Sequence, residues 1–218
     1  MSIPSIPDYP MPRAASAPAN KTAWRPEPRR ALLLIHDMQR YFLRFYDAHG
    51  ALRGTLVRNL QRLHAWAHAQ NVPVVYTAQP HEQPDADRAL LIDMWGPGLP
   101  AADPAQQAII DELAPQAGDQ VLAKWRYSAF QRSALLAHMH AAGRDQLIIG
   151  GVYAHRGCMA TALEAFMLDI QAFLAADAVA DFSADEHNMA LRYVATRCGH
   201  VMDTDAVVRI QTHDEVLP

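Results

Sequence analysis

The chain has 218 residues, 50% of them hydrophobic, and a formal net charge of −4. That length suits one well-buried domain, and the weak negative charge gives no reason to expect nucleic acid or an anionic membrane surface as a partner. No stretch is long and apolar enough for a membrane span, and the amino terminus lacks the basic and apolar regions of a secretion signal. With two cysteines, Cys158 and Cys198, the sequence favours a cytoplasmic enzyme with reduced thiols.

Residues 1–29 are expected to form an extended arm. They are rich in proline, which can continue neither a helix nor a central strand. Residues 30–218 are expected to form one domain, because they contain no internal repeat, low-complexity tract or second-domain boundary.

The predicted elements alternate between strand and helix. The apolar run Ala31–Ile35 predicts a strand buried on both faces, and the long stretch Gln79–Asp103 predicts a functional loop. The other predicted strands are 72–77, 120–124, 146–152, 172–176 and 200–202, and the predicted helices are 52–69, 105–112, 133–142, 161–170 and 184–197. This alternation predicts an α/β fold in which helices cover both faces of a parallel sheet.

Ligands of such sheets bind beyond the carboxyl ends of the strands. Asp37 follows the first predicted strand and Lys124 ends the third, so they are expected at the same edge, where an acid and a cation could form an acid–base pair. Taken singly, each has a plainer interpretation, as a turn aspartate or a surface lysine. The other residues that follow predicted strands are Gln39, Gln79, 125–127, 153–157 and 177–181.

Cys158 lies near the start of a predicted helix, where a thiol can become a nucleophile. A small buried side chain is an equally good interpretation. His155 is expected to be buried and hydrogen-bonded. The sequence contains no HExxH, CxxC, GxGxxG or GxxxxGK[ST] motif, so we expect neither a metal nor a cofactor.

Six segments in chain order carry a resemblance to a known family: residues 31–39, 76–80, 93–98, 124–130, 151–155 and 176–183. They resemble the bacterial isochorismatases of catecholate siderophore synthesis and their relatives in phenazine synthesis. The resemblance implies the isochorismatase-like hydrolase fold, a three-layer αβα arrangement with a six-stranded parallel sheet. It also implies a homo-oligomer that acts on a small molecule, with siderophore synthetase components as candidate partners. A cis peptide bond between Val152 and Tyr153 is expected.

The resemblance also implies site residues. Related amidases use a cysteine that would fall at position 157, where this chain has glycine, so Asp37 and Lys124 remain without a nucleophile. Gly157 is expected to leave space beneath the substrate's ether. Family members usually carry a small apolar residue where this chain has Arg156, which could face the pocket, solvent or a subunit interface. The implied catalytic residues are Asp37, Lys124 and Gly157, and the implied substrate-binding residues are Phe42, Gln79, Arg88, Trp95, Tyr127 and Tyr153.

The implied reaction is hydrolysis of isochorismate to pyruvate and 2,3-dihydro-2,3-dihydroxybenzoate. Asp37 would act as a general acid without a covalent intermediate. Burial among Phe42, Trp95 and Tyr153, together with the substrate's negative charge, would keep it protonated. The first alternative is hydrolysis of 2-amino-2-deoxyisochorismate in phenazine synthesis. Remoter alternatives are a cysteine amidase and a non-catalytic docking protein.

Overall fold

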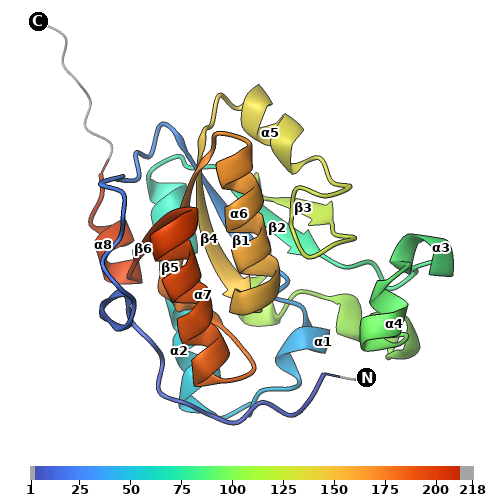
Figure 1. Ribbon diagram of the computed structural model, residues 1–218. Helices are drawn as coiled ribbons and strands as arrows, with labels where there is room; N and C mark the ends of the chain where they lie inside the picture. The colour runs from blue at the N-terminus through green and yellow to red at the C-terminus, as the bar shows by residue number, and fades with distance from the viewer. Residues whose placement is uncertain (1–2, 212–218) are drawn as a thin grey trace, which may run out of the picture.

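The computed structural model describes residues 3–211, and its centre is a six-stranded parallel sheet (Figure 1). The strands lie in the order β3-β2-β1-β4-β5-β6, and every neighbouring pair is parallel. Their bounds are β1 (Ala31–His36), β2 (Val74–Ala78), β3 (Gln120–Ala123), β4 (Gln146–Val152), β5 (Gln171–Ala180) and β6 (Gly199–Met202). The predicted α/β fold is therefore confirmed.

Helices cover both faces of this sheet (Figure 1), and alternate residues of β1 point into two separate cores. Leu33 and Ile35 pack with α2 (Ala51–Ala69) and α8 (Thr204–Val208). Leu32 and Leu34 pack with the helices on the other face, which are α5 (Leu135–Ala141), α6 (Met159–Met167) and α7 (Ala184–Arg197). Burial on both faces explains why β1 has no polar residue before His36.

The remaining helical segments are short. They are α1 (Arg40–Leu43), α3 (Asp85–Arg88), α4 (Leu91–Trp95), the 3-10 turns η1 (Ala14–Ser16), η2 (Leu99–Ala101), η3 (Pro104–Gln107) and η4 (Asp111–Leu113), and the π-helical turn η5 (Ala154–Cys158). Among residues 3–211, no helix has the length and apolar character that a membrane crossing demands.

The single helix predicted over 105–112 is wrong, because η3 and η4 are separated by extended backbone there. Ile109 forms a β-bridge with Gln39, and the Ile110 N–H donates to the Met38 carbonyl at 3.0 Å. The backbone hydrogen bonds of this segment therefore go to the chain after β1 rather than into a helix.

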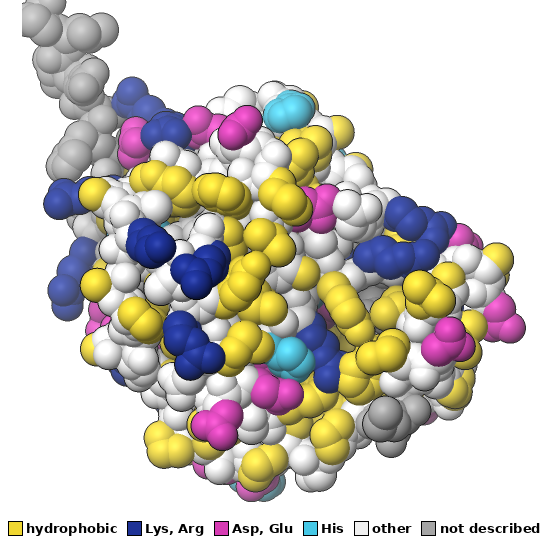
Figure 2. All heavy atoms as spheres, viewed as in Figure 1, with side chains coloured by type: hydrophobic (Ala, Val, Ile, Leu, Met, Phe, Trp, Pro, Cys, Tyr) yellow, Lys and Arg dark blue, Asp and Glu magenta, His cyan; other side chains and the backbone are white. Residues whose placement is uncertain are grey.

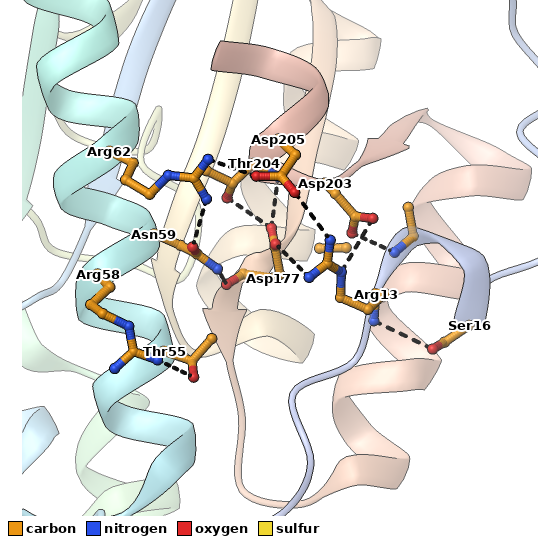
Figure 3. Close-up of polar contacts among 12 residues, drawn as sticks. Arg13, Ser16, Thr55, Arg58, Asn59, Arg62, Asp177, Asp203, Thr204 and Asp205 are labelled. Carbon is orange, nitrogen blue, oxygen red and sulfur yellow. Dashed lines mark hydrogen bonds and ion pairs between the residues drawn. The ribbon is translucent and has the colours of Figure 1, made fainter. Parts of the chain in front are cut away.

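Strand β5 is longer than predicted and places Asp177 within the sheet rather than after it. The buried Asp177 carboxylate accepts hydrogen bonds at 2.7 Å from both the N–H and the hydroxyl of Thr204, and Arg13 lies 3.7 Å away (Figure 3). Asp177 thus joins β5, α8 and the amino-terminal arm. The expectation that it lies at the ligand-binding edge is wrong.

The amino-terminal arm follows the surface of the domain. Ile6 donates its N–H to the Phe45 carbonyl at 2.8 Å, and Arg13 forms ion pairs with Asp203 and Asp205 as well as Asp177 (Figure 3). The far end of the predicted domain, residues 212–218, lies outside the described residues.

On the face drawn in Figure 2, Lys and Arg side chains stand in small groups among hydrophobic and acidic ones.

Candidate active site

One pocket opens at the carboxyl edge of the sheet, beside the ends of the neighbouring strands β1 and β4. Chain connections leave these two strands in opposite directions along the sheet, and ligands bind at such a point in doubly wound folds. The predicted site residues all line this pocket: Asp37, Phe42, Gln79, Arg88, Trp95, Lys124, Tyr127, Tyr153 and Gly157. Their predicted convergence is therefore confirmed, while their roles stay predictions. A larger hollow between the arm and α8 contains none of them.

Asp37 and Lys124 form a buried ion pair at this edge. Asp37 has φ of +51°, a left-handed conformation that aspartate adopts more readily than most residues. Its Oδ2 lies 2.8 Å from Lys124 Nζ, and the Thr77 hydroxyl donates to its Oδ1 at 2.8 Å. Only 4% of Asp37 and 3% of Lys124 is exposed. The two side chains are thus fixed by each other and by β2.

His36 is a pocket residue that the sequence analysis missed. Its Nδ1 donates to the Val152 carbonyl at 2.7 Å, and burial lowers the pKa of the imidazole, so the ring is neutral. A Cβ atom at Gly157 would lie 2.0 Å from His36 Cε1. The space beside Gly157 is therefore filled by the His36 ring, and the expectation that it is left open for the ether is wrong.

Cys158 points away from the pocket. It is fully buried in the core shared with α6 and α7, and burial raises the pKa of its thiol well above the usual range. A protonated thiol without access to the pocket cannot act as the nucleophile. The one-residue step from Gly157 is enough to turn this side chain into the core.

Arg88 is buried where the 79–103 segment wraps around it. Its Nε donates to the Gly96 carbonyl at 2.9 Å, and its Nη1 donates to Gln83 Oε1 at 2.9 Å. A Cβ atom at Gly98 would lie 2.3 Å from Arg88 Nη2, so the backbone at Gly98 packs directly against the Arg88 guanidinium. Burial lowers the pKa of Arg88, but an arginine keeps its charge in a protein. The expected functional loop thus presents a fixed cation to the pocket.

Aromatic side chains form the wall of the pocket. The Tyr153 hydroxyl donates to the Phe42 carbonyl at 2.9 Å, and the Tyr153 ring meets Phe182 edge to face at 4.6 Å. The Trp95 indole N–H donates to the Tyr127 hydroxyl at 2.7 Å. The expected cis peptide bond between Val152 and Tyr153 is present. The aromatic groups are held by one another and by backbone, which suits a water-poor site.

Of the orientations considered for Arg156, the structure shows the side chain at the pocket. Its guanidinium carbon lies 3.6 Å from the centre of the Trp95 ring and 4.3 Å from that of Phe182. Its Nε donates to His155 Nε2 at 2.8 Å, and His155 Nδ1 donates to the buried Asp181 at 2.5 Å. The Arg156 side chain makes no other hydrogen bond within the described residues 3–211. Its two terminal nitrogens are therefore available to an anion.

Gln79 and Gln39 hold two loops together at the pocket. Gln39 donates to the Gln79 carbonyl at 2.8 Å and accepts from the Gln79 N–H at 2.8 Å. Gln39 also donates to the Gln107 carbonyl at 2.7 Å. Gln39 therefore braces the site, and Gln79 is fixed through its backbone with its side chain at the pocket.

The fold and this pocket define a hydrolase of the isochorismatase-like type. The Isochorismatase domain model matches residues 31–206, so the chain belongs to the isochorismatase family. A solved structure with this fold, a cysteine hydrolase from Pseudomonas syringae, has a TM-score of 0.77 at 24% identity and covers 89% of this chain and 97% of its own.

Two curated groups of relatives are about equally similar to the chain. Enterobactin synthase component B of Escherichia coli is 52% identical over 208 residues, which are 95% of this chain and 73% of that protein. Isochorismatase of Bacillus subtilis is 53% identical over 208 residues, 95% of this chain and 66% of that protein. The phenazine biosynthesis protein PhzD of Pseudomonas fluorescens is 52% identical over 206 residues, 94% and 98% of the two chains. Identity alone therefore does not choose between the siderophore and phenazine groups.

Proposed function

We propose that this enzyme hydrolyses isochorismate to pyruvate and 2,3-dihydro-2,3-dihydroxybenzoate for catecholate siderophore synthesis. The observation that carries the proposal is the buried Asp37–Lys124 pair in a pocket without an accessible thiol. Relatives that are named isochorismatase and enterobactin synthase component B support the same reaction.

In the free enzyme the Asp37 carboxylate is paired with Lys124. In the proposed mechanism, it takes up a proton from solvent as the dianionic substrate binds, and it then transfers this proton to the methylene carbon of the enolpyruvyl group. The adjacent carbon becomes an oxocarbenium ion, and water adds to it while Asp37 takes back a proton. The resulting hemiketal collapses: its hydroxyl group loses its proton and becomes the carbonyl of pyruvate, the bond to the ring oxygen breaks, and the ring oxygen takes up that proton and leaves as a hydroxyl group. This sequence needs a general acid and base but no nucleophile. Lys124 and Thr77 hold the carboxyl group in position.

The charges of the pocket favour a dianion. Arg88, Lys124, Arg126 and Arg156 line it, and Asp37, the one acid in its lining within the described part of the chain, is paired with Lys124. Isochorismate carries two carboxylates, and arginine can hold a carboxylate through two parallel hydrogen bonds. Two of these arginines come from different segments, Arg88 from α3 and Arg156 from η5. They can therefore engage different ends of one substrate.

We also propose that the substituent by which the two substrates differ lies near Arg156, which would favour isochorismate over 2-amino-2-deoxyisochorismate. The amino analogue replaces a hydroxyl with a group that is positively charged at neutral pH. Two like charges about 6 Å apart repel by about 3 kcal/mol at an effective dielectric constant of ~20. Because Arg156 is partly exposed, we expect solvent to reduce this to about 1 kcal/mol. That still corresponds to a selectivity of about fivefold or more.

Coupled lactate dehydrogenase assays with the two substrates test the proposal. We expect pyruvate release from both and a higher kcat/KM for isochorismate. Arg156→Met should narrow the ratio of the two kcat/KM values, whereas Arg192→Met, a change of an exposed arginine on α7, should leave it unchanged. Folded protein that releases no pyruvate from either substrate would favour a docking protein and overturn the proposal.

The partners and assembly belong to the same proposal. We infer a small-molecule substrate, a homo-oligomer, and association with siderophore synthetase components, the last supported by the name of the relative from Escherichia coli. We also propose that residues 30–218 form the catalytic domain, with residues 1–29 as its arm. Sedimentation velocity of the purified chain tests the assembly, since a single monomer peak at all concentrations would contradict it.

A further inference from the structure

We propose that His64, His68 and Asp119 bind a divalent transition-metal ion such as Zn²⁺ at the end of the sheet opposite the active-site pocket. The two histidines are one helical turn apart near the carboxyl end of α2, and Asp119 directly precedes β3. Strands and pocket place catalysis at the carboxyl edge of the sheet, whereas this cluster lies where β3 begins. The proposed site is therefore independent of the proposed catalytic function.

The three side chains already converge. His64 Nε2 lies 2.7 Å from Asp119 Oδ2, and His68 Nε2 lies 2.9 Å from Asp119 Oδ1. One ligand atom from each residue can be chosen so that all lie within 4.8 Å of one another. Ligand distances of about 2.0–2.2 Å to Zn²⁺ require only a small outward shift of the imidazoles.

The carboxylate is held in place for such a role. Asp119 Oδ2 also accepts the Gln116 N–H at 2.8 Å, and only 1% of the Asp119 side chain is exposed. No Lys or Arg of the described chain forms an ion pair with it. In natural metal sites, residues that do not touch the metal fix its ligands through hydrogen bonds, and the Gln116 N–H makes such a bond to Asp119 here.

A second observation points to the same place. Tyr76 is fully buried, and its hydroxyl has no hydrogen-bond partner among the described residues. Its ring centre lies 6.0 Å from that of His64, and its pKa is raised by burial first and by the nearby Asp119 charge second. Buried hydroxyls without a partner are uncommon, and a metal-bound water beside this cluster would supply one.

The donor set selects the class of ion. Two imidazole nitrogens and one carboxylate oxygen suit Zn²⁺, Co²⁺, Ni²⁺ or Cu²⁺ rather than Mg²⁺ or Ca²⁺, which prefer oxygen ligands alone. On binding, each neutral imidazole moves its proton from Nε2 to Nδ1, so that Nε2 can coordinate the ion. His68 is 35% exposed on its side chain, which leaves a route for the ion and a position for water. The site would tie α2 to the edge strand β3.

Tag-free full-length protein tests the proposal by titration calorimetry with ZnCl₂ and by thermal unfolding. We expect one equivalent of Zn²⁺ to bind, and a Tm higher by about 5 °C when free Zn²⁺ is about 100 times Kd. Co²⁺ should give the intense visible absorption of tetrahedral coordination, whereas Mg²⁺ should not bind.

His68→Gln should lower the Zn²⁺ affinity by about tenfold or more, and because His68 is on the surface this variant should fold. His140→Gln, which alters an exposed histidine on α5, should leave the affinity unchanged. Pyruvate release should be the same in all three proteins, so a failed metal site and a failed catalytic proposal give different results. Absence of Zn²⁺ binding, or binding that His68→Gln does not weaken, would overturn the inference.

Discussion

Replacing Asp37 with asparagine separates the proton that the residue is proposed to supply from the shape that it provides. Asparagine has the size of aspartate and can keep the hydrogen bond to Thr77, but it cannot deliver a proton to carbon. A positioned general acid contributes about 10²–10⁴-fold to the rate. We therefore expect kcat to fall by about that factor, while the aromatic wall and Arg88 still bind the substrate.

The structure also predicts a stability cost. Lys124 is 3% exposed and its ammonium lies 2.8 Å from the Asp37 carboxylate. Asp37→Asn leaves this buried charge without its counter-ion, which costs about 3–5 kcal/mol. The free energy of unfolding of a domain is usually about 5–15 kcal/mol. A domain in the upper part of that range still folds after such a loss. Adding Lys124→Met removes the unpaired charge and should recover stability without recovering turnover.

Two measurements distinguish these effects. Urea unfolding gives the stability of each variant, and the lactate dehydrogenase assay gives kcat at saturating isochorismate. Asp37→Glu keeps an acid and a charge, so it should retain more activity than Asp37→Asn. Turnover by folded Asp37→Asn within tenfold of the parent rate would show that Asp37 is not the acid.

Three further outcomes follow from the site and the core. Cys158→Ala should leave kcat within a few-fold of the parent, because the thiol is buried away from the pocket; a covalent adduct on this sulfur would contradict the proposed mechanism. Gly157→Ala should lower stability by about 1–3 kcal/mol and reduce turnover, because its Cβ would lie 2.0 Å from His36 Cε1; unchanged urea unfolding would refute the assigned crowding. Burial lowers the pKa of His187 to about 4, whereas the unfolded chain takes up this proton near pH 6.5. Stability should therefore fall by roughly 3 kcal/mol as the pH drops from about 6.5 to about 4, and the pH dependence should be weaker in His187→Gln.

Much of the fold could be predicted from hydrophobic patterning. The strand 146–152 and the helix 184–197 were predicted with the bounds that the structure has. The helix prediction for residues 105–112 was wrong because the backbone of this segment pairs with residues far away in the sequence. Strand β5 was predicted too short because Asp177 looks like a strand-ending residue, whereas Arg13 and Thr204 make its burial tolerable.

In the candidate site, too, some features could be predicted from the sequence and others could not. Asp37 and Lys124 could be predicted to meet because parallel strands end at a common edge. The role of His36 could not, since it depends on the β1–β4 register that brings its ring to Val152 and Gly157. A histidine that ends a fully apolar strand was the available signal. The stacking of Arg156 on Trp95 and Phe182 joins three separate segments, and no local pattern encodes it.

The path of the arm has a practical consequence for anyone preparing this enzyme. Ile3 is part of the pocket lining, and Figure 1 shows the described chain beginning near α1 and α4. Further along, the Tyr9 hydroxyl accepts the N–H of Asp181 at 2.8 Å, the acid that orients His155 and through it Arg156. Because Ile3 lines the pocket, a purification handle fused to the amino terminus would begin within two residues of the proposed substrate site.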